Sequence, residues 1–218
     1  MRRGEAVLSE TGHDHSHEEP QHQRSPWAAR IRAVEELLIE KGVFTREEVK
    51  AQEEYIEART YENGARLVAR AWEDPAFKER LLSDTKAAAA ELGIDASGSI
   101  EFLTVENTDE VHNVIVCTLC SCYPRAILGR PPDWYKSSAY RSRVVVEPRE
   151  VLKEFGLQLP EDKRIAVHDS SADLRYLVLP QRPEETEGMS EDELSTLVTR
   201  ASLIGTDVPR TGREVSRV

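Results

Sequence analysis

The three cysteines of this chain lie within six consecutive positions, as Cys117, Cys120 and Cys122. Thiolates bind soft and borderline transition metals, so the Cys-x-x-Cys-x-Cys spacing predicts a metal site. Two peptide nitrogens, those of Ser121 and Cys122, lie between the last two sulfurs. One ion could therefore sit in a plane of two sulfurs and two nitrogens. The Cys117 sulfur would be a fifth ligand, and a sixth position would stay open for water or substrate.

These ligands restrict the choice of metal. A peptide nitrogen binds a metal only after losing its proton, and only a strongly Lewis-acidic ion, most plausibly a trivalent one, makes that exchange favourable. Zinc prefers four tetrahedral ligands, and a structural zinc would need His112 or another residue beside the three cysteines. The first interpretation is a catalytic metal claw, a name used below for residues 117–122. A thiol metallochaperone, or a redox protein using Cys117 and Cys120, is the non-enzymatic alternative.

Several segments after the claw carry a family resemblance. They are Leu128-Gly129, Pro131-Pro132-Asp133-Trp134-Tyr135-Lys136, Tyr140 to Val145, Arg175 to Pro183 and Leu203-Ile204-Gly205. With the claw sequence Cys-Thr-Leu-Cys-Ser-Cys, they resemble the alpha subunit of nitrile hydratase over residues 28–209. The resemblance implies an enzyme that hydrates a nitrile to an amide at low-spin cobalt(III) or iron(III). Thr118, where the iron enzymes usually carry serine, resembles the cobalt class.

The same resemblance implies roles for the claw residues and for partners. The metal ligands would be Cys117, Cys120, Ser121 and Cys122, with Ser121 contributing its amide nitrogen. Cys120 would be a sulfinic acid and Cys122 a sulfenic acid, both on the ordinary ladder of cysteine oxidation, and these two residues would be catalytic. A beta-type subunit would complete the site, an activator protein would load the metal, and the small-molecule partner would be a nitrile.

One departure from the family concerns the substrate. Nitrile hydratases commonly continue Pro-Trp-Pro after the claw, whereas this chain reads Pro124-Arg125-Ala126. An arginine here resembles thiocyanate hydrolase, whose metal subunit shares the claw, and nitrile hydratases acting on bulky heterocyclic nitriles such as toyocamycin. Arg125 is therefore the predicted substrate-binding residue, and thiocyanate is the alternative substrate. Most other basic residues after the claw, Arg141 among them, are expected to pair with surface acids.

Composition bears on the partners and the compartment. Forty acidic against 29 basic residues give a net charge of -11, which argues against nucleic-acid binding because that requires a broadly basic face. No apolar run is long enough to span a membrane, and the first residues lack the apolar core of a signal peptide. Three cysteines this close together cannot form a disulfide framework. We expect a cytoplasmic protein.

Two segments precede the part of the chain that holds the claw. Residues 1–24 are polar, contain four of the six histidines and are predicted to be a disordered tail, with loose binding of divalent metals as the alternative. Residues 25–95 predict a helical arm, with helix starts at Ser25-Pro26, Thr45 and Asp74-Pro75 and a turn at Asn63-Gly64. The last of these helices is predicted to end at Gly93. The arm folds onto the rest of the chain, extends around a beta-type subunit as the family resemblance implies, or forms a self-contained helical subdomain.

From Ile100 the apolar period becomes that of strands. Strands are predicted at 100–105, 114–116, 143–146, 164–168 and 174–179, and helices at 148–155 and 191–200. The claw follows the second strand directly, which gives it a rigid base. The fold class is therefore α+β. The resemblance implies a layered α-β-β-α catalytic domain over residues 96–218.

Overall fold

The structure is a computed structural model that describes residues 26–211, so the histidine-rich segment 1–24 lies outside the described residues. The chain divides into two compact units, Met1–Gln52 and Glu53–Val218. The first unit contains helix α1 (Pro26–Glu40) and the start of α2 (Arg46–Glu57). A capping box opens α2 at the helix start predicted at Thr45, because the Glu48 amide donates to the Thr45 hydroxyl at 3.1 Å and the Thr45 amide to the Glu48 carboxylate at 2.7 Å. None of the helices in the described range combines the length and apolar character needed to cross a bilayer.

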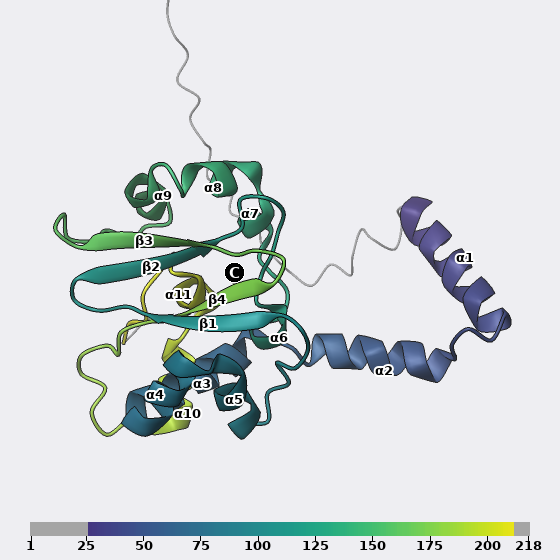
Figure 1. Cartoon of the computed structure of the whole chain (residues 1–218), viewed down its shortest axis with the longest axis horizontal. Helices are drawn as coiled ribbons and strands as arrows, with labels where there is room; N and C mark the ends of the chain where they lie inside the picture. The colour runs from purple at the N-terminus through teal and green to yellow at the C-terminus, as the bar shows by residue number, and fades with distance from the viewer. Residues whose placement is uncertain (1–25, 212–218) are drawn as a thin grey trace, which may run out of the picture. The chain divides into compact units, whose positions relative to one another are not determined.

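The second unit is a layered α+β fold (Figure 1). Its strands are β1 (Glu101–Glu106), β2 (Val111–Val116), β3 (Arg164–Asp169) and β4 (Leu174–Leu179). Strand β1 pairs with β4 and β2 with β3, both in parallel. Helices α3 (Tyr61–Glu73), α4 (Pro75–Ser83), α5 (Thr85–Glu91) and α10 (Glu191–Leu197) lie on one side of the strands. Helices α7 (Asp133–Lys136), α8 (Ser138–Arg143) and α9 (Pro148–Glu154) lie on the other side. The predicted α+β class is confirmed.

The pairing of β2 with β3 fixes where the claw emerges. Val116, the last residue of β2, lies opposite Asp169, the last residue of β3. Because parallel strands end at the same edge, the loop that follows β2 begins beside the carboxylate of Asp169. Val114, Ile115 and Val116 are fully buried, so the base of the claw is anchored in the core.

The predicted strand at 143–146 is wrong. Residues 138–143 form α8, and Val144 to Val146 form a turn before α9. The β-branched run suggested a strand, but only Val144 is buried, whereas Val146 is 80% exposed. Arg143 pairs with Glu147 four residues later, a spacing typical of a helical turn. The other four strands and both later helices are confirmed, although the last helix is interrupted after Leu197 and resumes as α11 (Arg200–Ile204).

Two helix boundaries in residues 60–93 also differ from the prediction. Asn63-Gly64 is not a turn but lies inside α3. Gly64 is required there by packing, because a Cβ atom would come within 2.5 Å of the Leu128 side chain. The segment opened by Asp74-Pro75 breaks at Asp84, whose carboxylate accepts from the Ala87 amide at 3.0 Å and starts α5.

A buried polar network links β2 to β3 and to the segments that follow β1 and α11. His112 Nε2 lies 2.7 Å from the Gly205 carbonyl oxygen, and its Nδ1 lies 3.3 Å from the Asn107 amide nitrogen. Because a carbonyl only accepts, the neutral ring carries its proton on Nε2 and accepts from Asn107 at Nδ1. His168 bonds Asn113 at 2.8 Å. Neither ring belongs to the cysteine cluster, because both are held by hydrogen bonds within the fold.

This network predicts how stability depends on pH. Burial lowers the pKa of His112 below its ordinary value of 6.5. At pH values near and below 6.5, the unfolded chain therefore binds more protons than the folded one. The contribution of His112 to stability is therefore complete above about pH 6.5 and is lost as the pH falls. We expect the urea midpoint to fall between pH 7 and pH 5, and to fall less in His112→Gln, whose amide still reaches Gly205 but does not titrate. Equal pH slopes for the two proteins would contradict this assignment.

Candidate metal centre

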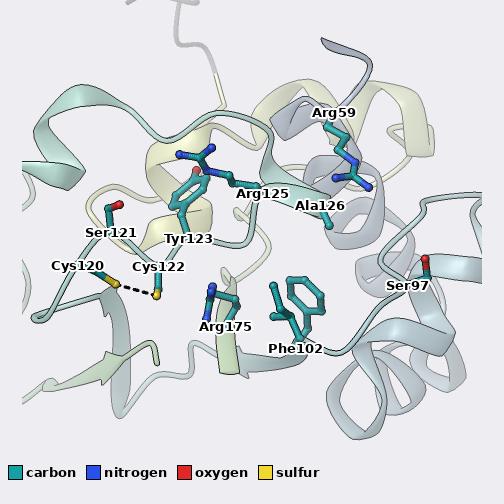
Figure 2. A pocket seen from close by; sticks show the side chains of 11 residues that line it. Arg59, Ser97, Phe102, Cys120, Ser121, Cys122, Tyr123, Arg125, Ala126 and Arg175 are labelled. Atoms are coloured by element: carbon teal, nitrogen blue, oxygen red, sulfur yellow. Dashed lines mark hydrogen bonds between the residues drawn. The ribbon is translucent and has the colours of Figure 1, made fainter. Parts of the chain in front are cut away.

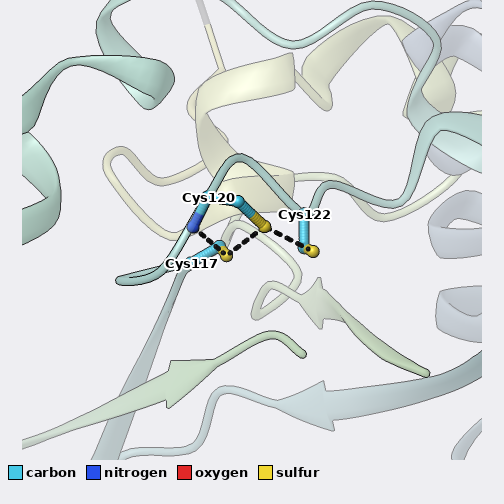
Figure 3. A group of neighbouring side chains, drawn as sticks. All are labelled: Cys117, Cys120 and Cys122. Carbon is cyan, nitrogen blue, oxygen red and sulfur yellow. Dashed lines mark hydrogen bonds between the residues drawn. The ribbon is translucent and has the colours of Figure 1, made fainter. Parts of the chain in front are cut away.

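The claw brings the three sulfur atoms into contact (Figure 3). The Sγ atoms of Cys117 and Cys120 are 3.5 Å apart and those of Cys120 and Cys122 are 3.1 Å apart. All three lie within 4.8 Å of one another, close enough to share one ion. Cys117 is buried at the end of β2, whereas Cys120 is exposed. The sequence-predicted sulfur ligands are therefore adjacent, with one face open toward solvent.

The thiols of Cys120 and Cys122 differ in their affinity for protons. Hydrogen bonds with Cys122, with Cys117 and with the backbone amides of Ser121 and Cys122 lower the pKa of Cys120 to about 7. Burial, and then the hydrogen bond with Cys120, raises the pKa of Cys122 to about 12. Cys120 is therefore the first of these two thiols to ionise. The amides of Ser121 and Cys122, the predicted nitrogen ligands, already face its sulfur.

Charged side chains from two later elements hold the first half of the claw. Arg141 of α8 donates from Nε to the Cys117 carbonyl at 3.0 Å and from a terminal nitrogen to the Thr118 carbonyl at 2.8 Å. Asp169 of β3 accepts from the Thr118 amide at 2.9 Å and from its hydroxyl at 2.6 Å. Serine has the same hydroxyl, so this contact does not by itself distinguish threonine from serine at position 118.

Aromatic side chains hold the second half. The Tyr135 hydroxyl donates to the Cys122 carbonyl at 2.9 Å, and the Tyr140 hydroxyl donates to the Ile115 carbonyl at 2.7 Å. The Tyr123 ring meets the Tyr135 ring edge to face at 5.0 Å, and Trp134 packs on Tyr140 at the same distance. The Trp134-Tyr135 pair and Tyr140 therefore form the wall on which the claw is fixed.

A pocket of about 350 Å³ opens beside Cys120 and Cys122 (Figure 2). Arg125, at the start of α6 (Arg125–Leu128), lines it together with Arg175 of β4. Arg175 is only 8% exposed and donates to the Leu174 carbonyl at 3.1 Å. Its positive charge acts to lower the pKa of Cys122, against the effect of burial. Arg125 thus lies where a molecule reaching the claw would pass.

Sequence reasoning missed three residues of this site. Arg141 was expected to pair with surface acids, but it holds the claw. Asp169 lay just beyond the strand predicted at 164–168 and was given no role, and Arg175 was treated only as part of a strand. A signal existed for Asp169, a charged residue ending a strand, but its partner is 51 positions away and depends on the register of β2 and β3.

The donor set fits a trivalent metal better than zinc. Among the described residues, no histidine, aspartate or glutamate joins the three cysteines. His112, the candidate fourth ligand for zinc, is bound to Gly205 and Asn107 instead. Three sulfurs and the amide nitrogens of Ser121 and Cys122 could hold a cobalt(III) or iron(III) ion, whose charge can displace amide protons.

Comparisons with known proteins identify the family of this chain. The family described as nitrile hydratase, alpha chain, matches residues 25–207. The cobalt-containing nitrile hydratase subunit alpha of Pseudonocardia thermophila is 52% identical over 186 residues, which is 82% of this chain and 89% of that one. Among solved structures, a recombinant thiocyanate hydrolase with partially modified cobalt centres has a TM-score of 0.81 at 42% identity, covering 86% of this chain and 92% of the other. An Fe-type nitrile hydratase double mutant from Comamonas testosteroni Ni1 has a TM-score of 0.79 at 45% identity, covering 85% and 91%.

Proposed function

Because this chain belongs to the nitrile hydratase alpha-chain family, we propose that it is the metal-binding subunit of an enzyme that hydrates a nitrile to the amide. The contact of all three cysteine sulfurs in one loop is the observation that carries the proposal. Membership of an enzyme family also argues against the non-enzymatic alternative, a thiol metallochaperone. Water adds across the carbon–nitrogen triple bond, so its oxygen bonds to the carbon and both of its protons reach the nitrogen.

The claw would hold one cobalt(III) ion through three sulfurs and two amide nitrogens, with Cys120 as sulfinic and Cys122 as sulfenic acid. The 52% identical relative contains cobalt, which favours this metal over iron. When bound, the ion supplies Lewis acidity to the nitrile nitrogen and makes the carbon electrophilic. Cys122 lies at the pocket, so an oxygen on its sulfur can accept a proton from the attacking water or attack the carbon itself.

The residues around the claw would prepare it for this chemistry. Arg141, Asp169 and Tyr135 hold its backbone, which keeps the ligand atoms in place while substrate exchanges. Arg175 faces the Cys122 side of the pocket, where its charge would stabilise an anionic sulfur oxygen. Pocket walls made by Phe102 and Ala126 would exclude water from one side of the substrate.

The helical segment at the start of the described residues would bind the beta-type subunit. Along α1, Trp27, Ile31 and Val34 are 68%, 65% and 55% exposed and share one face. Burial of such a stripe against another chain is strongly favourable, because each large apolar side chain contributes about 1.5 to 3 kcal/mol. An activator protein would load the metal, as the family resemblance implies.

Intact-peptide mass spectrometry of the claw tests the proposed metal centre. We expect two added oxygens on Cys120, one on Cys122 and none on Cys117, together with one cobalt per chain. Unmodified cysteines around cobalt held tetrahedrally by sulfur alone would contradict it. Activity then identifies the reaction, since a nitrile hydratase releases an amide from benzonitrile.

Thiocyanate hydrolysis is the second candidate function. A thiocyanate hydrolase is among the similar structures, and Arg125 would be the counter-ion for that anion. The same preparation assayed with thiocyanate and with benzonitrile separates the two functions, because only one of the substrates should be turned over efficiently.

A further inference from the structure

The pocket beside the claw is positively charged, although the protein is acidic. Three arginines line it, namely Arg59, Arg125 and Arg175, and no carboxylate from the described part of the chain does. The chain as a whole has a net charge of -11. A cavity lined by one sign of charge concentrates ligands of the opposite sign, so this cavity favours anions.

Arg125 has its charge available to a ligand. Its side chain is exposed, and within residues 26–211 no carboxylate lies within ion-pair distance of it. By contrast, Lys136 and Arg143, which follow on the chain, pair with Asp133 and with Glu147. The backbone of Arg125 is held in place, because Ile127 and Leu128 of the same helix are fully buried.

Arg59 forms the end of the pocket away from the cysteines (Figure 2). Its backbone packs closely against Gly129, the residue after α6. A Cβ atom at Gly129 would lie only 2.1 Å from the Arg59 carbonyl oxygen, so the two backbones are in direct contact. The guanidinium packs over the Tyr55 ring at 4.0 Å and lies 3.6 Å from Asp95, so most of its charge is compensated. Its buried Nε has no hydrogen-bond partner among the described residues.

One wall of the pocket is apolar. Phe102 and Ile100 come from β1 and the segment before it, and Ala126 follows Arg125 on α6 (Figure 2). A volume of about 350 Å³ lies within the usual range of sites for organic ligands, about 300 to 1,000 Å³. A three-atom anion would leave most of this space unfilled, whereas an aromatic ring would use the apolar wall.

We infer that the pocket selects nitriles that carry a remote carboxylate. The nitrile reaches the claw, the apolar body lies on Phe102, and the carboxylate binds the Arg125 guanidinium, with Arg59 closing the far end. This inference rests on the proposed function, because it names the substrate class of the same site.

The test compares two substrates of nearly the same shape. Para-cyanobenzoate carries the carboxylate, and para-cyanobenzamide replaces it with a neutral amide. The ratio of their kcat/KM values is measured for the cobalt-loaded enzyme with its beta-type subunit, for Arg125→Gln and Arg125→Lys, and for Arg130→Gln. Arg130 is exposed and lies outside the pocket, so its variant removes the same charge without altering the site. Calorimetric binding of the product para-carbamoylbenzoate gives a readout that does not depend on turnover.

We expect the wild-type enzyme to have a higher kcat/KM for para-cyanobenzoate than for para-cyanobenzamide. In Arg125→Gln, the ratio of these kcat/KM values and the affinity for para-carbamoylbenzoate should each fall about tenfold. Arg125→Lys should retain part of the preference for the carboxylate, and Arg130→Gln all of it. The preference should also weaken as salt is added. Hydration of benzonitrile without any preference for the carboxylate, or an unchanged ratio in Arg125→Gln, would overturn the inference and leave the proposed function standing. Hydrolysis of thiocyanate that is faster than hydration of para-cyanobenzoate would overturn it in favour of a small anion. A cobalt-loaded enzyme that hydrates no nitrile would overturn the proposed function, and this inference with it.

Discussion

Replacing Cys122 with alanine is expected to lower kcat of the assembled enzyme by at least about a thousandfold, as removal of a central catalytic group does in other enzymes. Cys122 is the last sulfur of the claw, 3.1 Å from the Cys120 sulfur, and it lines the pocket. Its loss removes both a proposed metal ligand and the proposed sulfenate oxygen. Amide release from benzonitrile and cobalt per chain are measured together.

A second substitution separates ligand chemistry from packing. Cys122→Ser keeps a polar atom of similar size but not a soft sulfur ligand, so its activity should be as low as that of Cys122→Ala. Both variants should retain the circular-dichroism spectrum and assembly with the beta-type subunit, because Cys122 is only partly buried. Near-normal rates in either variant would refute the role assigned to Cys122.

The claw could be predicted from sequence because it is local. Its three sulfurs and two amide nitrogens lie within six positions, so the chain's own bond geometry brings them together. The strand that anchors the claw was also readable, because Val114, Ile115 and Val116 form a short apolar run that ends at Cys117. Nothing distant in the chain had to be known for either step.

The residues that hold the claw could not be predicted in the same way. Arg141 contacts a carbonyl 24 positions earlier, and Asp169 contacts an amide 51 positions earlier. Both contacts depend on tertiary features, the docking of α8 and the parallel register of β2 with β3. The sequence of a basic segment does not show whether an arginine such as Arg141 will pair with a surface carboxylate or donate to a backbone carbonyl.

The secondary-structure errors have a similar origin. Val144 to Val146 have the composition of a strand, but α8 starts at a Ser137 cap and continues into salt bridges from Arg143 to Glu147 and Glu154. Gly64 follows asparagine, a common turn pair, yet its missing side chain is needed inside a helix where Leu128 packs. In both places tertiary contacts outweighed a local preference.

Replacing Arg141 with methionine is expected to weaken cobalt retention by about tenfold to a hundredfold, the usual cost of losing a residue that supports metal ligands. The Arg141 guanidinium donates to the Cys117 carbonyl at 3.0 Å and to the Thr118 carbonyl at 2.8 Å. Methionine keeps much of the side-chain volume but can donate to neither carbonyl. The claw backbone then gains freedom that metal binding must remove. Cobalt per chain after dialysis against a chelator measures the effect, and oxidation of Cys120 and Cys122 is followed in the same samples.

Arg143→Met is the matched control, because it makes the same substitution on the same helix. Among the described residues, Arg143 bonds Glu147 and Glu154 and does not touch the claw, so its loss should reduce stability slightly and leave cobalt in place. Arg141→Lys should lie between the wild type and Arg141→Met, since an ammonium can reach one carbonyl but cannot span both. Equal cobalt loss in the two methionine variants would mean that α8, and not the Arg141 guanidinium, stabilises the site. Full retention in Arg141→Met would mean that Asp169 and Tyr135 alone are sufficient to hold the claw.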